Sequence, residues 1–152
     1  MLNIKYKSSG FTLIELLLVI SIVLIIGTFS AVFYTRFLTQ NAVANTQDQL
    51  IGQLRKAQIY SMISKYSNTW GVHYESNTIT LFNGVSYASR NQVLDEKFTV
   101  NPNISIEYVP SPIVDIIFSR MTGIPSWSGT ITITGNSDPK TITINSQGVT
   151  SR

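Results

Sequence analysis

The sequence predicts an α+β fold, in which one long N-terminal helix packs on a mainly antiparallel β-sheet head. Two observations lead to this class. The first is an apolar run followed by an amphipathic stretch of helical periodicity, which together extend to residue 67. The second is a change after Asn68 to short segments rich in strand-forming residues, several of which alternate Thr with Ile. A one-faced helix and one-faced strands can bury each other, which gives a layered α+β domain.

The apolar run covers residues 11–34 and has the length of a helix that crosses a lipid bilayer. Its only charged residue is Glu15. Residues 1–10 are polar and basic, and they contain Lys5 and Lys7. Because cationic flanks tend to stay in the cytoplasm, we expect one membrane span with a cytoplasmic N-terminus and the rest of the chain outside.

Residues 35–67 are expected to continue the helix as an amphipathic half, since they contain no proline and their apolar side chains recur at helical spacing. We expect this helix to end at Ser67 or Asn68. Its predicted buried face comprises Leu50, Ile51, Leu54, Ala57 and Met62.

Residues 68–152 are expected to form a β-rich globular head. The segments TWGVHY and NTITLFN predict a hairpin, a short strand is expected near residues 98–100, and two further strands lie on either side of Pro110 and Pro112. The last two predicted strands, GTITITG and KTITIN, alternate with a period of two. This alternation places on one buried face Ile131, Ile133, Ile142 and Ile144.

Composition excludes several classes of function. The chain of 152 residues has no cysteine, which rules out disulfides, thiol catalysis and thiolate metal sites. From Phe11 onward, nine Lys and Arg residues stand against eight Asp and Glu, and this near neutrality disfavours a dedicated nucleic-acid surface. We expect no cofactor, metal ion or enzymatic activity, because the single histidine, His73, accompanies no nucleophile motif and no stretch resembles a calcium loop.

Gly10 and Glu15 are unusual for an ordinary membrane anchor. A secretory signal carries its cleavage site after the apolar region, whereas Gly10 precedes it. A carboxylate inside a membrane span costs up to about 2.5–3.5 kcal/mol, which makes Glu15 a candidate functional residue. Cleavage of the Gly10–Phe11 bond would create a cationic α-amine at Phe11, one helical turn from Glu15. In a bundle of staggered copies, this carboxylate can pair with the amine of a neighbour and fix the axial register.

The sequence SGFTLIEL at residues 9–16 resembles the prepilin cleavage and methylation signature of type IV pilins, pseudopilins of type II secretion and competence pilins. The resemblance covers about residues 5–35. It implies cleavage after Gly10 by a prepilin peptidase, N-methylation of Phe11 and a role for Glu15 in subunit assembly.

The same resemblance implies partners and a location. The partners are other pilin or pseudopilin subunits, an inner-membrane assembly platform and membrane lipid. The location is the cytoplasmic (inner) membrane, followed by a filament in the periplasm or at the cell surface.

The C-terminal part is similar to the tail of the minor pseudopilins that include the type II secretion H-type and fimbrial T-type proteins. That tail has a strand, a glycine-containing loop and two final strands ending in a glycine, and these glycines correspond to Gly123, Gly129 and Gly148. The resemblance implies a minor subunit, and it leaves open whether the machine serves secretion, a pilus or competence.

Two alternative functions remain open from sequence. One is a DNA-binding minor pilin of a DNA-uptake pilus, in which Arg120, Lys140 and Arg152 line the DNA surface, although three scattered cations are also typical of a solvated face. The other is an enzyme or receptor domain on a plain membrane anchor. That hypothesis predicts that Gly10 and Glu15 can be substituted freely.

Overall fold

The computed structural model describes residues 10–111, 115–135 and 138–152, without the side chains of residues 29–32. The chain forms two compact units, Met1–Phe37 and Leu38–Arg152. One α-helix, α1 (Leu13–Met62), begins in the first unit and ends in the second. Each unit is described by itself below.

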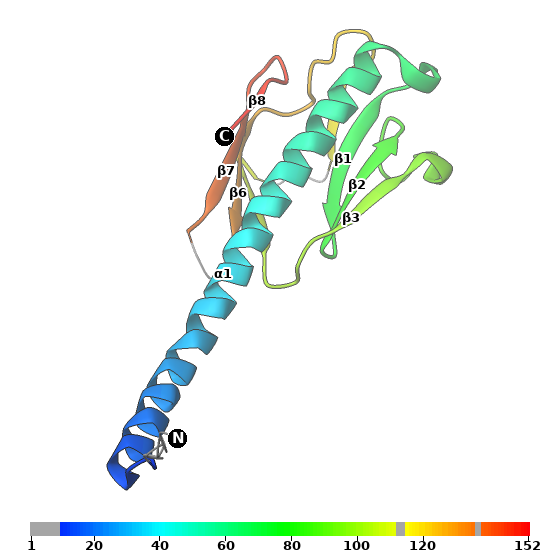
Figure 1. Ribbon diagram of the computed structural model, residues 1–152. Coiled ribbons are helices and arrows are strands. Elements are labelled where there is room, and N and C mark those ends of the chain that lie inside the picture. Colours follow the sequence, from blue (N-terminus) through cyan, green and yellow to red (C-terminus); the bar gives the residue numbers. More distant parts are fainter. Residues whose placement is uncertain (1–9, 112–114, 136–137) are drawn as a thin grey trace, which may run out of the picture. The chain divides into compact units, whose positions relative to one another are not determined.

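In the first unit, the predicted apolar run is helical from Leu13 onward (Figure 1). Within the described part of the chain, α1 is the one helix that is long and apolar enough to cross a membrane. Its apolar side chains in this unit are exposed, and they include Leu16, Leu17, Leu18, Ile20, Ile22, Leu24, Ile25 and Ile26. This half of α1 therefore presents an apolar surface on all sides.

In the second unit, α1 contributes one face to the core. The predicted burial of Leu50, Ile51, Leu54 and Ala57 is confirmed. The prediction was wrong for Met62, which is half exposed, because the α-helix ends there and not at Ser67.

The early helix end has a local cause. Ser64 adopts a left-handed backbone conformation with φ 53°, which a right-handed α-helix cannot accommodate. A 3₁₀ turn, η1 (Lys65–Ser67), then leads into the first strand. Its Tyr66 also has a positive φ, so this connection is irregular along most of its length.

The strands form two four-stranded sheets within the described residues, and all of the strand pairs are antiparallel. Sheet A has the order β3-β2-β1-β5, from β1 (Trp70–Glu75), β2 (Thr78–Asn83), β3 (Glu96–Thr99) and β5 (Asp115–Phe118). Sheet B has the order β4-β6-β7-β8, from β4 (Ser105–Val109), β6 (Gly129–Thr134), β7 (Lys140–Ile144) and β8 (Thr150–Ser151). A short 3₁₀ turn, η2 (Gln92–Leu94), precedes β3.

The hairpin predicted after Asn68 is confirmed as β1 and β2, which turn at Ser76 and Asn77. The expectation of one sheet was wrong. β5 pairs with β1, and β4 pairs with β6, so the chain crosses three times between the sheets. Residues 113–114 of the predicted strand before Phe118 lie outside the described residues.

The core of the second unit lies between α1 and both sheets. Figure 1 shows the strands of sheet A and of sheet B on different sides of the second half of α1. The predicted inward face of the last two long strands is confirmed, because fully buried side chains there include Ile131, Ile133, Ile142 and Ile144. A buried polar contact joins the layers, in which Gln47 Nε2 donates to the Thr141 carbonyl oxygen at 2.8 Å. The α+β class predicted from sequence is thereby confirmed.

Candidate maturation and assembly site

The first candidate site is the start of α1. Gly10, Phe11 and Thr12 are outside the helix, which begins at Leu13. The Phe11 side chain is 83% exposed, and a Cβ atom added to Gly10 would have no atom within 4 Å. The bond between these two residues is thus solvent-accessible and non-helical, as a peptidase substrate has to be.

Thr12 caps the helix, a role that the sequence reasoning missed. The Glu15 backbone N–H donates to Thr12 Oγ1 at 3.3 Å. A Thr followed three residues later by a Glu is the sequence pattern of a capping box, and this signal could have located the helix start at Leu13. The helix dipole also stabilises a carboxylate in the first turn, by about 0.3–1 kcal/mol at exposed positions.

The Glu15 carboxylate is exposed at the start of the apolar half of α1. Among the described residues, no cationic group lies within ion-pair distance of it. Capping therefore accounts for the Glu15 backbone, while its carboxylate remains available for a charge supplied from another chain.

Two of the glycines in the C-terminal part are required by the backbone. Gly123 and Gly148 have φ of 67° and 82°, which disfavour any residue with a Cβ atom. Each also packs closely on α1, since an added Cβ would lie 2.6 Å from Met62 Cγ and 2.5 Å from Gln58 Nε2, respectively. The third glycine of the predicted pattern, Gly129, opens β6.

Residues 5–31 match the family model described as the prokaryotic N-terminal methylation motif. The match includes Gly10, Phe11 and Glu15. The fold is similar to that of the minor pseudopilin EpsH from the Type 2 Secretion System of Vibrio cholerae, with a TM-score of 0.54 and 11% sequence identity. That similarity covers 72% of this chain and 94% of the EpsH chain. The chain thus carries the N-terminal methylation motif, and its fold is similar to that of a minor pseudopilin.

At this level of identity, the likeness to EpsH shows the fold alone. No curated protein matches the sequence. The motif and the apolar helix together indicate a membrane-anchored subunit.

The three residues considered for DNA binding do not form one cluster. Arg120 Nε donates to Ser64 Oγ at 3.1 Å, whereas Arg152 forms an ion pair with Asp48. Asp48 lies within α1, whereas Ser64 follows the end of the helix at Met62. At 1.5 Å per helical residue, these two contact points are more than 20 Å apart along the helix. The DNA-binding hypothesis stays a prediction, without a continuous basic surface to support it.

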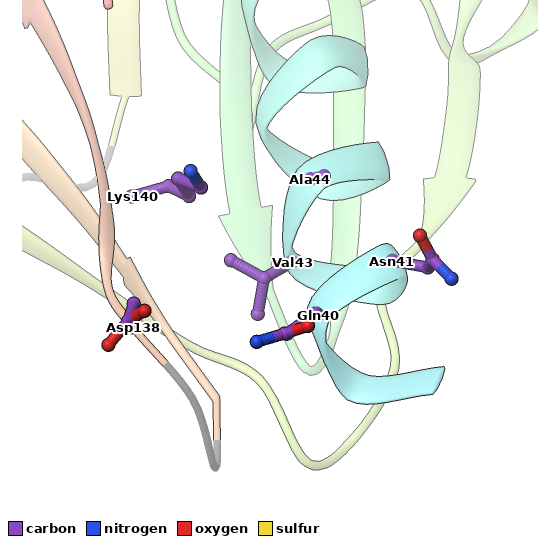
Figure 2. A pocket seen from close by; sticks show the side chains of 6 residues that line it. All are labelled: Gln40, Asn41, Val43, Ala44, Asp138 and Lys140. Atoms are coloured by element: carbon purple, nitrogen blue, oxygen red, sulfur yellow. The ribbon is translucent and has the colours of Figure 1, made fainter. Parts of the chain in front are cut away.

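Lys140, the third of these residues, lines a hollow of about 350 Å³ beside α1 (Figure 2). Its other lining residues are Gln40, Asn41, Val43, Ala44 and Asp138. Figure 2 shows Val43 and Gln40 on the side of α1 toward Lys140 and Asp138. Because one cation and one carboxylate share this hollow, it has no net charge that would attract a polyanion.

His73 is buried in β1, and its partner is one that the sequence reasoning did not identify. His73 Nδ1 lies 2.7 Å from Asp115 Oδ1 in β5, and the other Asp115 oxygen accepts from the Tyr87 backbone N–H at 3.0 Å. The Tyr87 ring stacks on the His73 ring with centroids 3.7 Å apart. These contacts tie two strands of sheet A to the loop that follows β2, which is a structural role.

Arg90 lies in the same loop after β2 and contacts Tyr87. Its guanidinium carbon lies 3.6 Å from the centroid of the Tyr87 ring, and its Nη1 donates to the Tyr87 carbonyl oxygen at 2.6 Å. A hydrogen bond from Arg90 Nε to Asp95 raises the pKa of the guanidinium further above its usual range. The loop is therefore held on both faces of one aromatic ring.

Three carboxylates of the head have cationic or histidine partners. Asp95 pairs with Arg90, Asp115 with His73, and Glu96 with Lys56. The hydrogen bond to Glu96 raises the pKa of the Lys56 ammonium. Within residues that the structure describes, no three His, Cys, Asp or Glu side chains gather as metal ligands would.

Proposed function

We propose that this protein is a minor pseudopilin, a structural subunit of a type II secretion or type IV pilus filament. A prepilin peptidase cuts it after Gly10, and Phe11 becomes the N-methylated first residue. The single observation that carries the proposal is the start of α1. An exposed, non-helical Gly10–Phe11 bond stands directly before a helix that carries an exposed carboxylate in its first turn.

The first half of α1 supports this role energetically. Its apolar side chains are exposed around the whole helix, so lipid before assembly and neighbouring subunits afterwards would cover them. In the assembled filament, the Glu15 carboxylate of one subunit pairs with the Phe11 amine of its neighbour. Desolvation offsets much of that attraction, and the pair acts chiefly by fixing the axial register.

The location follows from the same features. Before assembly, the subunit is a single-pass protein of the cytoplasmic membrane, with its N-terminus in the cytoplasm and its head outside. An inner-membrane assembly platform then transfers it to a filament in the periplasm or at the cell surface. The likeness of the fold to the minor pseudopilin EpsH favours a minor over a major subunit.

The test is the intact mass of the full chain, purified from membranes of cells that also produce a prepilin peptidase. We expect a mature chain that begins at methylated Phe11, and a Gly10→Ala variant that stays uncut. Gly27→Ala is the matched control, because an added Cβ meets no atom within 4 Å at either glycine. An uncut wild-type chain, or one cut beyond the apolar run, would refute the proposal in favour of a plain membrane anchor.

A further inference from the structure

The end of α1 and two loops of the head form one surface. The Met121 backbone N–H donates to the Ser61 carbonyl oxygen at 2.9 Å, which attaches the loop after β5 to the helix. Gln58 Nε2 donates to the carbonyl oxygens of Gly123 and Gln147, which attaches both that loop and the loop after β7. The helix end and the two loops are thus held together by backbone and side-chain hydrogen bonds.

This surface carries six exposed apolar side chains, here named the terminal patch. It comprises Ile59, Met62, Ile63, Met121, Ile124 and Val149. Met121 and Ile63 are 69% and 65% exposed. A contiguous apolar patch on a folded domain marks an interaction surface. Methionine adapts its shape to a partner, and both methionines beyond Met1 lie in this patch.

The backbone around the terminal patch is strained. Ser64, Tyr66, Ser67 and Met121 have φ between 53° and 68°, and they are four of the six non-glycine residues with positive φ in the described chain. Such conformations cost about 1–3 kcal/mol each and cluster where function requires a particular arrangement. Met121 combines a positive φ with a side chain that is mostly exposed to solvent.

The charge around the terminal patch has one sign. The three segments that build it, residues 58–68, 119–126 and 145–149, contain no Asp or Glu. They contain Arg120, which is exposed, and Lys65, whose ammonium lies 3.7 Å from the Tyr60 ring centroid. A complementary surface therefore has apolar side chains flanked by carboxylates.

We propose that the terminal patch docks a different protein subunit of the filament, through an apolar surface flanked by carboxylates on that subunit. The inference rests on the proposed function, since it assumes a filament of several subunit types. A second copy docked through the same patch would gather Arg120 and Lys65 of both copies at one interface without any carboxylate from the three segments, and like charges repel.

The test is photo-crosslinking of the full chain in cells whose assembly machinery is active. The photoreactive residue p-benzoylphenylalanine replaces Met121, and it replaces Val93 in the control, because Val93 is exposed on η2 and outside the patch. We expect a Met121 adduct with a different pilin-like subunit, identified by mass, at least fivefold more abundant than any adduct from Val93. Adding Arg120→Glu should reduce this adduct at least fivefold, whereas Arg120→Lys should retain it.

Several outcomes would overturn the inference. These are an adduct of two copies of this chain, an adduct with lipid alone, no adduct above the Val93 control, and an adduct indifferent to Arg120→Glu. The mature mass and filament incorporation are measured in the same cells. A processed and incorporated chain without the Met121 adduct refutes the docking surface alone, whereas an unprocessed chain refutes the proposed function as well.

Discussion

The helix α1 places leucines in two different situations. Leu17, in the first unit, is 52% exposed, whereas Leu54, in the second unit, is fully buried. Burial of a leucine side chain stabilises a folded domain by about 1.5–3 kcal/mol. The rest of the chain covers Leu54 and provides this stabilisation. Leu17 is not covered in this way, so only lipid or another chain can bury its side chain.

The two halves of α1 therefore have different structural roles. Its second half is part of a domain core, where Leu50, Leu54 and Ala57 face the two sheets. Its first half carries the candidate assembly residues and an exposed apolar surface. Substitutions in the first half should therefore change assembly and leave folding of the head intact, whereas substitutions of buried residues in the second half should destabilise the head.

The largest effect is expected for Glu15→Ala. Because the Phe11 amine of the neighbour would lose its partner in a desolvated environment, incorporation into filaments should fall at least tenfold. Membrane insertion and the unfolding of the head should not change. The measurement compares the filament and membrane fractions, with Glu107→Ala on β4 as an exposed control. Normal incorporation of Glu15→Ala would exclude the ion-pair mechanism.

Leu54→Ala and Leu17→Ala form a matched pair. Leu54→Ala should lower the free energy of unfolding of the head by about 2–5 kcal/mol, because it leaves a cavity in the core. Leu17→Ala should leave this free energy unchanged. Both tryptophans, Trp70 and Trp127, belong to the second unit, so denaturant titration of the full chain in detergent by tryptophan fluorescence reports on the head alone. Equal effects of the two substitutions would show that the units are not energetically separate.

Asp115→Ala tests the polar contacts of the head. Removal of the carboxylate leaves His73 Nδ1 and the Tyr87 N–H without their acceptor, which should cost about 1–3 kcal/mol of unfolding free energy. Filament incorporation at a temperature well below the midpoint of unfolding should be unaffected. Glu107→Ala, at an exposed position, is expected to stay within about 0.5 kcal/mol of wild type. If Asp115→Ala also changed the free energy of unfolding by less than about 0.5 kcal/mol, the other contacts of the loop after β2 would be sufficient to hold it.

The smallest effect is expected at alkaline pH. Burial, with a contribution from Tyr74, raises the pKa of the Tyr108 phenol above its ordinary value of 10.0. The unfolded chain therefore loses this proton first, so the stability is fully present below pH 10 and falls as the pH rises further. Between pH 9 and 11 the free energy of unfolding should fall by about 1 kcal/mol on this account. Tyr108→Phe should lessen the fall, whereas exposed Tyr66→Phe should not.

Local features of the sequence determined much of this protein. The apolar run, the SGFTLIEL signature and the Thr–Ile alternation each depend on neighbours within a few residues, and they predicted the helix, the methylation motif and the buried isoleucines. Even Thr12 carried a local signal, the Thr-x-x-Glu spacing, that locates the helix start. The roles of Gly10, Phe11 and Glu15 in processing and assembly remain predictions from this signature.

The tertiary structure decided how these elements combine. Short turns suggested one sheet, but β5 pairs with β1 and β4 with β6, because strand pairing depends on packing between residues distant in the chain. The contact of His73 with Asp115 spans 42 positions, and no local pattern encodes it. Met62 has the helical spacing of a core residue, yet it is half exposed, because α1 ends there and only the loop at Gly123 packs closely on it. The sequence by itself thus determined what each segment is, and only the tertiary structure decided which surfaces remain exposed for partners.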